Sequence, residues 1–353
     1  MIILLKRFSL FLVFVLLIPI NAYGALNIGD SSYASVSIDC DSGRILYENN
    51  SYMTLPMAST TKVMTCLLAC ESDKLGDIVT ITEEMLDGTE GSSIYLAVGD
   101  KITLYDLVKG AMLSSGNDAA HSIAVYLSDS VDKFVREMNK RAVEIGATST
   151  EFVTPSGLDK DNHHSTAYDM ALIASQAMKN SVFAEICKLK SSSITINNEK
   201  QTLYNHNKLL AYNENFVGVK TGFTEKAGRC LISAYDYEGC KIITVTLNAP
   251  NDWQDHKNIV EFCKSKYTEY DRHNVYTIDV VGGEKVRVMC LAHYKVYSLD
   301  EISVKAYYYP FIYAPVEAGE KVGKLKIYSN EKLISTVDII VKDGVKQWQT
   351  QTK

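Results

Sequence analysis

The sequence predicts an α+β protein in which helices pack on the faces of an antiparallel sheet and a small all-β C-terminal domain follows. Strand-like runs occur near the start of the chain and again beyond Leu189, with helical patterns between them. Strands supplied by both ends of a segment favour an antiparallel sheet covered by the helices in between. Beyond about His273 only short strands are expected. With 353 residues, 46% of them hydrophobic, the chain is long enough for two domains and a large core.

The first part of the chain is expected to hold one hairpin and then a series of helices. The hairpin joins Ser32 to Ile38 with Arg44 to Glu48 around the turn signal Asp41-Ser42-Gly43. Asp77 to Thr82 and Gly99 to Ile102 resemble short extended pieces of a peripheral subdomain. Apolar spacing and capping residues predict helices over 59–71, 104–112, 119–126, 131–145 and 167–178.

The second part of the chain is rich in β-formers. For the first domain we expect strands at 193–196, 217–220, 230–234 and 241–247, closed by a helix over 253–267. Glycine-containing turns then separate the short strands of the small β domain, expected at 275–280, 285–290, 302–308, 322–329 and 332–341.

The N-terminus has the pattern of a secretory signal peptide. Lys6 and Arg7 precede the apolar stretch Phe8 to Ile20, and Ala22-Tyr23-Gly24 supplies small residues for cleavage. An uncleaved anchor is the alternative, and either way the body is expected outside the cytoplasm, on the outer face of the cytoplasmic membrane or beyond it. The expected organisation is signal peptide 1–24, a larger α+β domain 25–270, a β-rich domain 271–345 and a tail 346–353.

Charge and cysteine content narrow the function classes. The formal net charge is −6, and it becomes about −8 without the predicted signal peptide, which disfavours nucleic acid as a partner. An even number of cysteines in an exported protein permits disulfides. We expect mostly free, buried thiols and no zinc site, because the cysteines are scattered through apolar segments without metal-ligand spacing. They are Cys40, Cys66, Cys70, Cys187, Cys230, Cys240, Cys263 and Cys290.

A serine and a lysine one helical turn apart give the first chemical signal. Ser59 and Lys62, at positions i and i+3 of a predicted helix, share one face. A serine hydroxyl becomes a good nucleophile when a base takes its proton, and a lysine is such a base only when neutral. Its pKa must therefore be lowered by burial or by a neighbouring cation. Alone, the pattern is weak evidence, because it recurs by chance and is more often a capped helix with one exposed lysine.

Two further motifs follow downstream. Ser115-Gly116-Asn117 lies at a break between two predicted helices, where a hydroxyl and an amide can point into one cleft. Lys220-Thr221-Gly222 ends an extended run, which can offer backbone groups to a peptide substrate, and the glycine leaves room for close approach. Taken alone, Ser115-Gly116-Asn117 is more simply explained as a helix-capping turn, and Lys220-Thr221-Gly222 as the end of a strand.

In this order, the three motifs resemble those of penicillin-binding proteins and class A β-lactamases. Further segments are similar to the low-molecular-weight penicillin-binding proteins of D-alanyl-D-alanine carboxypeptidase type, peptidase family S11. These segments are Pro155-Ser156-Gly157-Leu158-Asp159, His164-Ser165-Thr166-Ala167-Tyr168-Asp169-Met170 and Lys220-Thr221-Gly222-Phe223-Thr224 with Ala227-Gly228. Pro315-Val316-Glu317-Ala318-Gly319 with Gly323 is similar to the β domain of that family.

The resemblance implies a β-lactamase/transpeptidase-like fold and removal of the terminal D-alanine from peptidoglycan stem pentapeptides. It implies that Ser59 is the nucleophile, acylated by substrate or by penicillin, and that Lys62 is its base. Ser115 would relay the proton to the leaving amine, and Asn117 would orient Lys62 and the substrate.

The resemblance also implies the substrate-binding groups. Lys220 and Thr221 would contact the terminal carboxylate, Gly222 would allow the acyl group to approach, and the N–H groups of Ser59 and Phe223 would form the oxyanion hole. No metal or cofactor is expected in the reaction. Peptidoglycan stem peptides and β-lactam inhibitors are the expected partners, with no nucleic acid.

The chain departs from the family at two positions. Phe223 stands where some members carry histidine, and Asn248-Ala249-Pro250 stands where some place an arginine for the substrate carboxylate. Capture of the carboxylate must then depend on Lys220 and Thr221, or on another group such as His206 or Arg229.

Several alternatives remain at this stage. A serine β-lactamase would need a carboxylate-activated water, but no Glu-x-x-Leu-Asn segment lies between Asn117 and Lys220. A D,D-endopeptidase of the same fold, or a catalytically silent wall-binding module, would differ in substrate or in penicillin labelling. His163 and His164 could serve catalysis or a metal, although a helix start explains them more simply. The tail has Trp348 as almost its only apolar anchor, which disfavours membrane attachment through it, and peripheral membrane association is kept only as an alternative.

Overall fold

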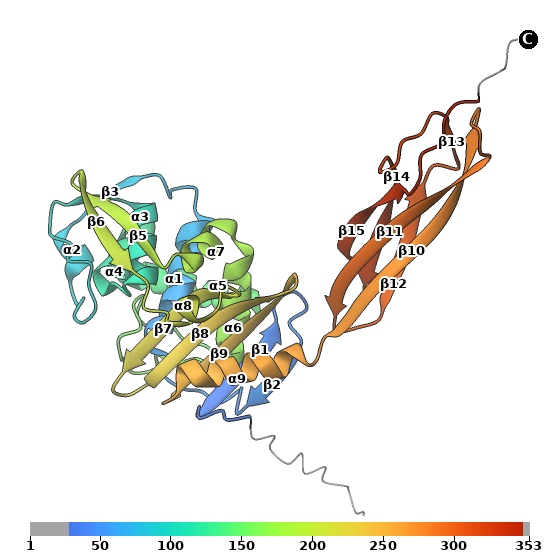
Figure 1. The fold of residues 1–353 in the computed structure, drawn as a ribbon. Helices are drawn as coiled ribbons and strands as arrows, with labels where there is room; N and C mark the ends of the chain where they lie inside the picture. The colour runs from blue at the N-terminus through green and yellow to red at the C-terminus, as the bar shows by residue number, and fades with distance from the viewer. Residues whose placement is uncertain (1–27, 349–353) are drawn as a thin grey trace, which may run out of the picture.

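The computed structural model describes residues 28–348. Figure 1 shows a larger part, in which helices surround a sheet, and an elongated β part that follows it. The expected α+β fold with an all-β C-terminal domain is therefore confirmed. The predicted signal peptide and the last five residues of the tail lie outside the described residues. No helix within 28–348 has the combined length and apolarity to span a membrane.

The central sheet is antiparallel and takes strands from both ends of its segment. Within the described chain its order is β2-β1-β9-β8-β7, and Ala34 of the first strand lies opposite Leu247 of β9. The strand bounds are β1 Ala34–Asp39, β2 Ile45–Asn49, β7 Phe216–Thr224, β8 Gly228–Tyr237 and β9 Cys240–Leu247.

Helices pack on both faces of this sheet. In Figure 1, α9 lies across one face, against β8 and β9, while α6 packs on β1 and β9 from the other side. The helices are η1 Ala58–Thr61, α1 Lys62–Glu71, α2 Glu83–Leu86, α3 Leu104–Leu113, α4 Asn117–Ser128, α5 Val131–Ile145, α6 Ala167–Lys179, α7 Ser181–Lys188, α8 Leu209–Tyr212 and α9 Asp252–Lys264. Helices α2, α7 and α8 were not predicted from the sequence, and α9 ends three residues before its predicted end.

Alternation along β9 explains the two layers. Val245 joins the core shared with the helical region, whereas Ile242 joins the core beneath α9. The α9 side also buries polar groups: His256 of α9 bonds Ser233 at 2.6 Å and Thr246 at 3.0 Å. Burial lowers the pKa of His256 to about 3, so this imidazole is neutral and serves as a hydrogen-bonded core residue.

Two short antiparallel ribbons accompany the helical region. β3 Ile78–Thr80 pairs with β4 Lys101–Thr103, and β5 Ser191–Ile196 pairs with β6 Glu199–Tyr204. The run 193–196, expected among the strands of the main sheet, thus belongs to a separate ribbon. The reason is packing against α3, since Lys109 donates to the Ser193 carbonyl at 2.7 Å.

The C-terminal part has its own sheet and core. Its strand order within the described residues is β12-β14-β15-β11-β10-β13, antiparallel except for the β10–β13 pair. The boundary between the two domains, which was expected between residues 270 and 271, falls inside β10. The bounds are β10 Thr268–Val281, β11 Arg287–Ser298, β12 Ile302–Tyr308, β13 Phe311–Tyr313, β14 Lys321–Ser329 and β15 Lys332–Val341.

The cysteines are packing residues. All eight lie in the described part of the chain, each is unpaired, and all but Cys240 are buried. Burial raises the pKa of the Cys70 thiol to about 12. The expectation of free, buried thiols is confirmed.

Candidate active site

Ser59 and Lys62 meet at the junction of η1 and α1. Lys62 Nζ lies 2.8 Å from Ser59 Oγ, so the i,i+3 spacing does bring the amine to the hydroxyl. Ala58, directly before the serine, has φ +48°, a left-handed conformation that is uncommon for residues with a Cβ. Such backbone strain often occurs at functional sites.

The environment of Lys62 favours its neutral form. Its Nζ lies 2.7 Å from Asn117 Oδ1 and 2.6 Å from the Ser156 carbonyl oxygen, both of which only accept hydrogen bonds. A neutral amine has two protons for these oxygens, which leaves its lone pair for the Ser59 hydroxyl proton. Burial, followed by the nearby charge of Lys220, holds the pKa of Lys62 well below its usual range. The arrangement can therefore act as a general base.

The amide of Asn117 is held in one orientation. Its Nδ2 donates to the Glu90 carbonyl, so Oδ1 faces Lys62. The backbone N–H of Asn117 donates to the Ser92 carbonyl at 2.7 Å. The segment between α2 and β4, which contains Glu90 and Ser92, therefore sets the position of this side chain.

Asp118, which was not predicted from the sequence, holds that segment in place. Its buried carboxylate accepts hydrogen bonds from the Ser93 hydroxyl and from the backbone N–H groups of Ile94 and Leu96. An acidic residue in the first turn of α4, next to a proposed site residue, was the signal that could have identified it.

Ser115 and Lys220 form a second linked pair. Ser115 lies between α3 and α4 with φ +60°, and its buried Oγ accepts from Lys220 Nζ at 3.0 Å. Lys220 also donates to the Thr221 carbonyl at 2.9 Å. Burial lowers the pKa of Lys220 to about 8, so this lysine exchanges its proton near neutral pH.

Strand β7 passes directly against the serine. A Cβ at Gly222 would lie only 3.1 Å from the backbone nitrogens of Ser59 and Thr60, so a side chain there would crowd the start of η1. Thr221 is half-buried beside it, and the Phe223 ring is exposed. The structure therefore brings all three sequence motifs to one place.

The loop that supplies the Ser156 carbonyl was also missed as part of the site. Gly157 adopts φ +86°, and a Cβ there would lie 2.0 Å from the Ala58 carbonyl oxygen. The loop can thus approach the strained residue before Ser59 only with glycine at this position. In the sequence, this segment is apparent only through the family resemblance of Pro155 to Asp159.

His163 supports the same region as a structural residue. Its Nδ1 accepts from the Val153 N–H at 2.9 Å, and Nε2 lies 2.9 Å from Thr61 Oγ1. Burial lowers the pKa of His163 to about 4, so the ring is neutral. Because both ring nitrogens are occupied, the geometry favours the structural explanation over a metal or catalytic role.

Of the two alternative carboxylate-binding groups, Arg229 already has a partner. Its guanidinium contacts both carboxylate oxygens of Asp252, at 2.8 and 2.9 Å, and lies over the Trp253 ring. His206 has its pKa lowered by burial and then by the charge of Lys220.

The family model for D-alanyl-D-alanine carboxypeptidase, peptidase S11, matches residues 26–251. The chain belongs to this family. A second model, for the C-terminal domain of penicillin-binding protein 5, matches residues 271–347 of this D-alanyl-D-alanine carboxypeptidase family member. Both matches agree with the family that the sequence motifs indicated.

Curated relatives match this member of the carboxypeptidase family, one over most of the chain and another over a shorter part of it. D-alanyl-D-alanine carboxypeptidase DacF of Bacillus subtilis is 28% identical over 337 residues, covering 89% of this chain and 86% of the relative. DacC of Escherichia coli is 36% identical over 230 residues, covering 62% of this chain and 57% of its own length.

Solved structures of the same family show the same fold. Penicillin-binding protein 5 from Haemophilus influenzae aligns with a TM-score of 0.62 at 26% identity, covering 90% of this chain and 98% of that one. A mutant of the Streptomyces K15 DD-transpeptidase aligns with a TM-score of 0.64 at 28% identity, covering 67% and 98%.

Proposed function

We propose that the protein is a serine-type D-alanyl-D-alanine carboxypeptidase that removes the terminal D-alanine from peptidoglycan stem pentapeptides. Membership of the S11 family and several relatives with that name support this function. The observation on which the mechanism rests is the buried Lys62 amine, bonded to two carbonyl oxygens and to Ser59 Oγ.

In the acylation step, the Ser59 hydroxyl proton moves to Lys62 Nζ as Oγ attacks the carbonyl carbon between the two D-alanines. The N–H groups of Ser59 and Phe223 hold the resulting oxyanion, an effect worth about 3–4 kcal/mol per donor in other serine hydrolases. The C–N bond then breaks, and a proton passes through Ser115 to the leaving D-alanine. Water hydrolyses the acyl-enzyme, releases the shortened peptide and restores Ser59.

Substrate binding would use the groups around the same pocket. Asn117 orients Lys62, and Lys220 with Thr221 attracts the terminal carboxylate, while the backbone of β7 lies beside the peptide. Gly222 keeps the approach to Ser59 open. Penicillin would acylate Ser59 in place of the peptide and remain attached.

The cellular setting is part of the proposal. The basic and apolar pattern of residues 1–24 supports export, and a cell-wall substrate requires an extracytoplasmic location, with or without peripheral membrane association. Catalysis is assigned to the segment 25–270, with the β-rich segment 271–345 and the tail 346–353 following it. A contribution to peptidoglycan maturation and cell shape follows from the substrate.

Mass spectrometry of purified pentapeptide muropeptides tests this function. We expect the loss of one alanine with the protein as expressed, and no loss with Ser59→Ala. Labelling with fluorescent penicillin should disappear in the same variant, and a Ser59→Ala protein that still labels would refute the nucleophile. Cleavage of cross-linked dimers would instead indicate an endopeptidase, and rapid penicillin turnover a β-lactamase.

A further inference from the structure

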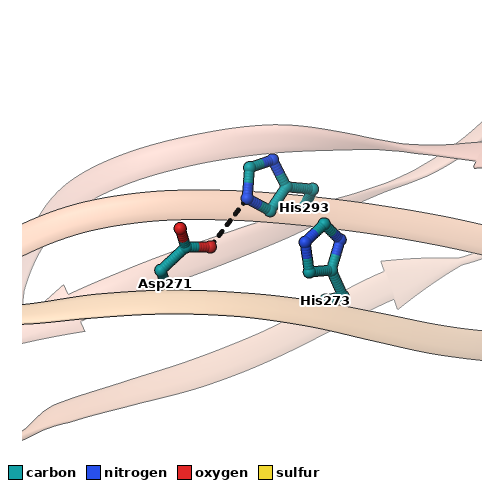
Figure 2. A group of neighbouring side chains, drawn as sticks. All are labelled: Asp271, His273 and His293. Atoms are coloured by element: carbon teal, nitrogen blue, oxygen red, sulfur yellow. Dashed lines mark hydrogen bonds and ion pairs between the residues drawn. The ribbon is translucent and has the colours of Figure 1, made fainter.

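Two histidines and an aspartate come together on the exposed face of the C-terminal sheet. Asp271 and His273 lie on β10, and His293 lies directly opposite His273 on β11. Figure 2 shows the two rings side by side, with the Asp271 carboxylate facing His293. Donor atoms of all three side chains lie within 4.8 Å of one another. The cluster is remote from the chemistry proposed above and is not needed for it.

We propose that Asp271, His273 and His293 form a binding site for one divalent transition-metal ion, with Zn²⁺ as its best probe. Imidazole nitrogen with carboxylate oxygen suits zinc and the neighbouring transition metals. Calcium and magnesium instead take six or more ligands that are mostly oxygens.

The spacing of the donor atoms supports this site. Zinc bonds of about 2.0–2.2 Å place neighbouring ligand atoms roughly 3 Å apart. His293 Nε2 and Asp271 Oδ1 are already 2.8 Å apart. The His273 ring is stacked on His293 at 4.1 Å between centroids, and both rings are exposed, so a turn about their side-chain torsions brings a third donor to the ion. Water or a group from another molecule would complete the coordination.

The surrounding charges allow a cation to bind. Lys295, which lies opposite Asp271 in the strand register, has its ammonium 3.3 Å from Glu269. The Glu269 carboxylate thereby offsets this positive charge and leaves the Asp271 carboxylate for the ion. Arg272 donates to the Asp271 backbone carbonyl at 3.0 Å.

The location gives the site a structural consequence. In the described chain, β11 pairs with β15 only at Cys290 and Leu291, so its stretch from Ala292 to Ser298 has β10 as its only strand partner. A two-stranded ribbon is marginally stable by itself. An ion bound by both strands would connect them near the junction with α9.

Titration of the metal-free, tag-free chain with Zn²⁺ tests the proposal. We expect one zinc equivalent with a dissociation constant below about 10 μM, measured by competition with a chromophoric chelator, and no competition from millimolar Mg²⁺. His273→Gln and His293→Gln should each weaken this binding by more than about ten-fold, since loss of a supporting partner alone costs that much at other sites. Asp271→Asn should weaken it in the same direction.

Two control variants test whether a histidine or a cysteine outside the cluster binds the zinc ion instead. His164→Gln removes a partly exposed histidine outside the cluster, and Cys240→Ser removes the one described thiol that is not fully buried. Both should keep the zinc equivalent. Nuclear magnetic resonance of the imidazole groups should show zinc-dependent changes at His273 and His293.

The proposal fails if no equivalent binds below that concentration, or if the equivalent persists in both histidine variants of the cluster. Zinc-dependent signals confined to other histidines would overturn it as well. The cluster side chains are exposed and those of the two controls are partly exposed, so circular dichroism is expected to show native folding of each variant before titration. None of these readouts depends on peptidase activity, so their failure leaves the proposed function intact.

Discussion

At the scale of single residues, the protonation state of Lys62 Nζ decides whether the site can take the proton of the Ser59 hydroxyl. The ammonium form would donate to Ser59, Asn117 and Ser156 together, whereas the amine leaves its lone pair for the serine proton. Burial and the charge of Lys220 favour the amine. The i,i+3 spacing was readable from the sequence, but the carbonyl of Ser156, which lies 94 residues away, was not.

Replacing Lys62 with arginine should abolish most of the acylation. A guanidinium stays protonated at all accessible pH values, so it cannot accept the Ser59 proton. We expect penicillin acylation to slow by about 10²–10⁴-fold, the usual contribution of a general base. Stopped labelling reactions with fluorescent penicillin give the rate, and the melting temperature reports folding. A folded variant labelling within ten-fold of the native rate would exclude Lys62 as the base.

The two lysines should give a bell-shaped pH profile of kcat/KM. Activity rises with pH as Lys62 loses its proton, and the lowered pKa places this rise below the usual range of lysine. Activity falls again near pH 8, where Lys220 loses the charge that attracts the substrate carboxylate. Lys220→Arg stays charged, so its profile should lack the fall. A fall at the same pH in that variant would assign it to a different group.

At the scale of elements, close backbone approaches assemble the site. β7 reaches η1 because Gly222 has no side chain, and the loop after α5 reaches Ala58 because Gly157 has none. The strand and the helix were expected from periodicity, and Thr103 and Thr166 do cap α3 and α6. Their contact was not predictable from local pattern, since it depends on how the layers pack.

Substituting Gly157 with alanine should damage the site through a clash as well as through backbone strain. Its Cβ would meet the Ala58 carbonyl at 2.0 Å, and φ is +86°. We expect a loss of about 1–3 kcal/mol in unfolding free energy and slower acylation, as the Ser156 carbonyl moves away from Lys62. Denaturant melts and penicillin labelling measure the two effects.

Gly43→Ala is the matched control for this prediction. Gly43 has φ +71°, but nothing lies within 4 Å of where its Cβ would stand. It should lose about 1 kcal/mol from strain alone and label at the native rate. Equal effects of the two substitutions on labelling would show that the Gly157 contact is unimportant for the site.

At the scale of the whole molecule, the two parts have largely separate cores and meet at a mixed junction, where the rings of Tyr237 and Tyr297 lie 5.0 Å apart between centroids beside two ion pairs. Arg44 pairs with Asp300 at 2.9 Å and Lys332 pairs with Asp41 at 2.9 Å, all partly exposed. The proposed catalytic groups lie in the larger part, and the candidate metal cluster lies on the β part. Figure 1 shows the β part extending away from the helices around α1.

Removing the positive charges of Arg44 and Lys332 should loosen the contact between the two parts without affecting acylation. Exposed ion pairs contribute about 0–1 kcal/mol each, so Arg44→Ala with Lys332→Ala should leave the melting temperature nearly unchanged. Penicillin labelling should stay within two-fold, while small-angle scattering should show a broader range of shapes. A ten-fold drop in labelling would mean that the β part supports the active site directly.

By itself the sequence determined the fold class, the family, the capped helices and the pairing of Ser59 with Lys62. These features depend on short-range spacing, and helix and strand geometry converts such spacing directly into neighbouring side chains. Tertiary structure alone decided that Glu90 orients Asn117, that Ser115 meets Lys220 and that His273 faces His293. Those contacts join distant segments, and only the packing of layers and the register of strands brings such segments together.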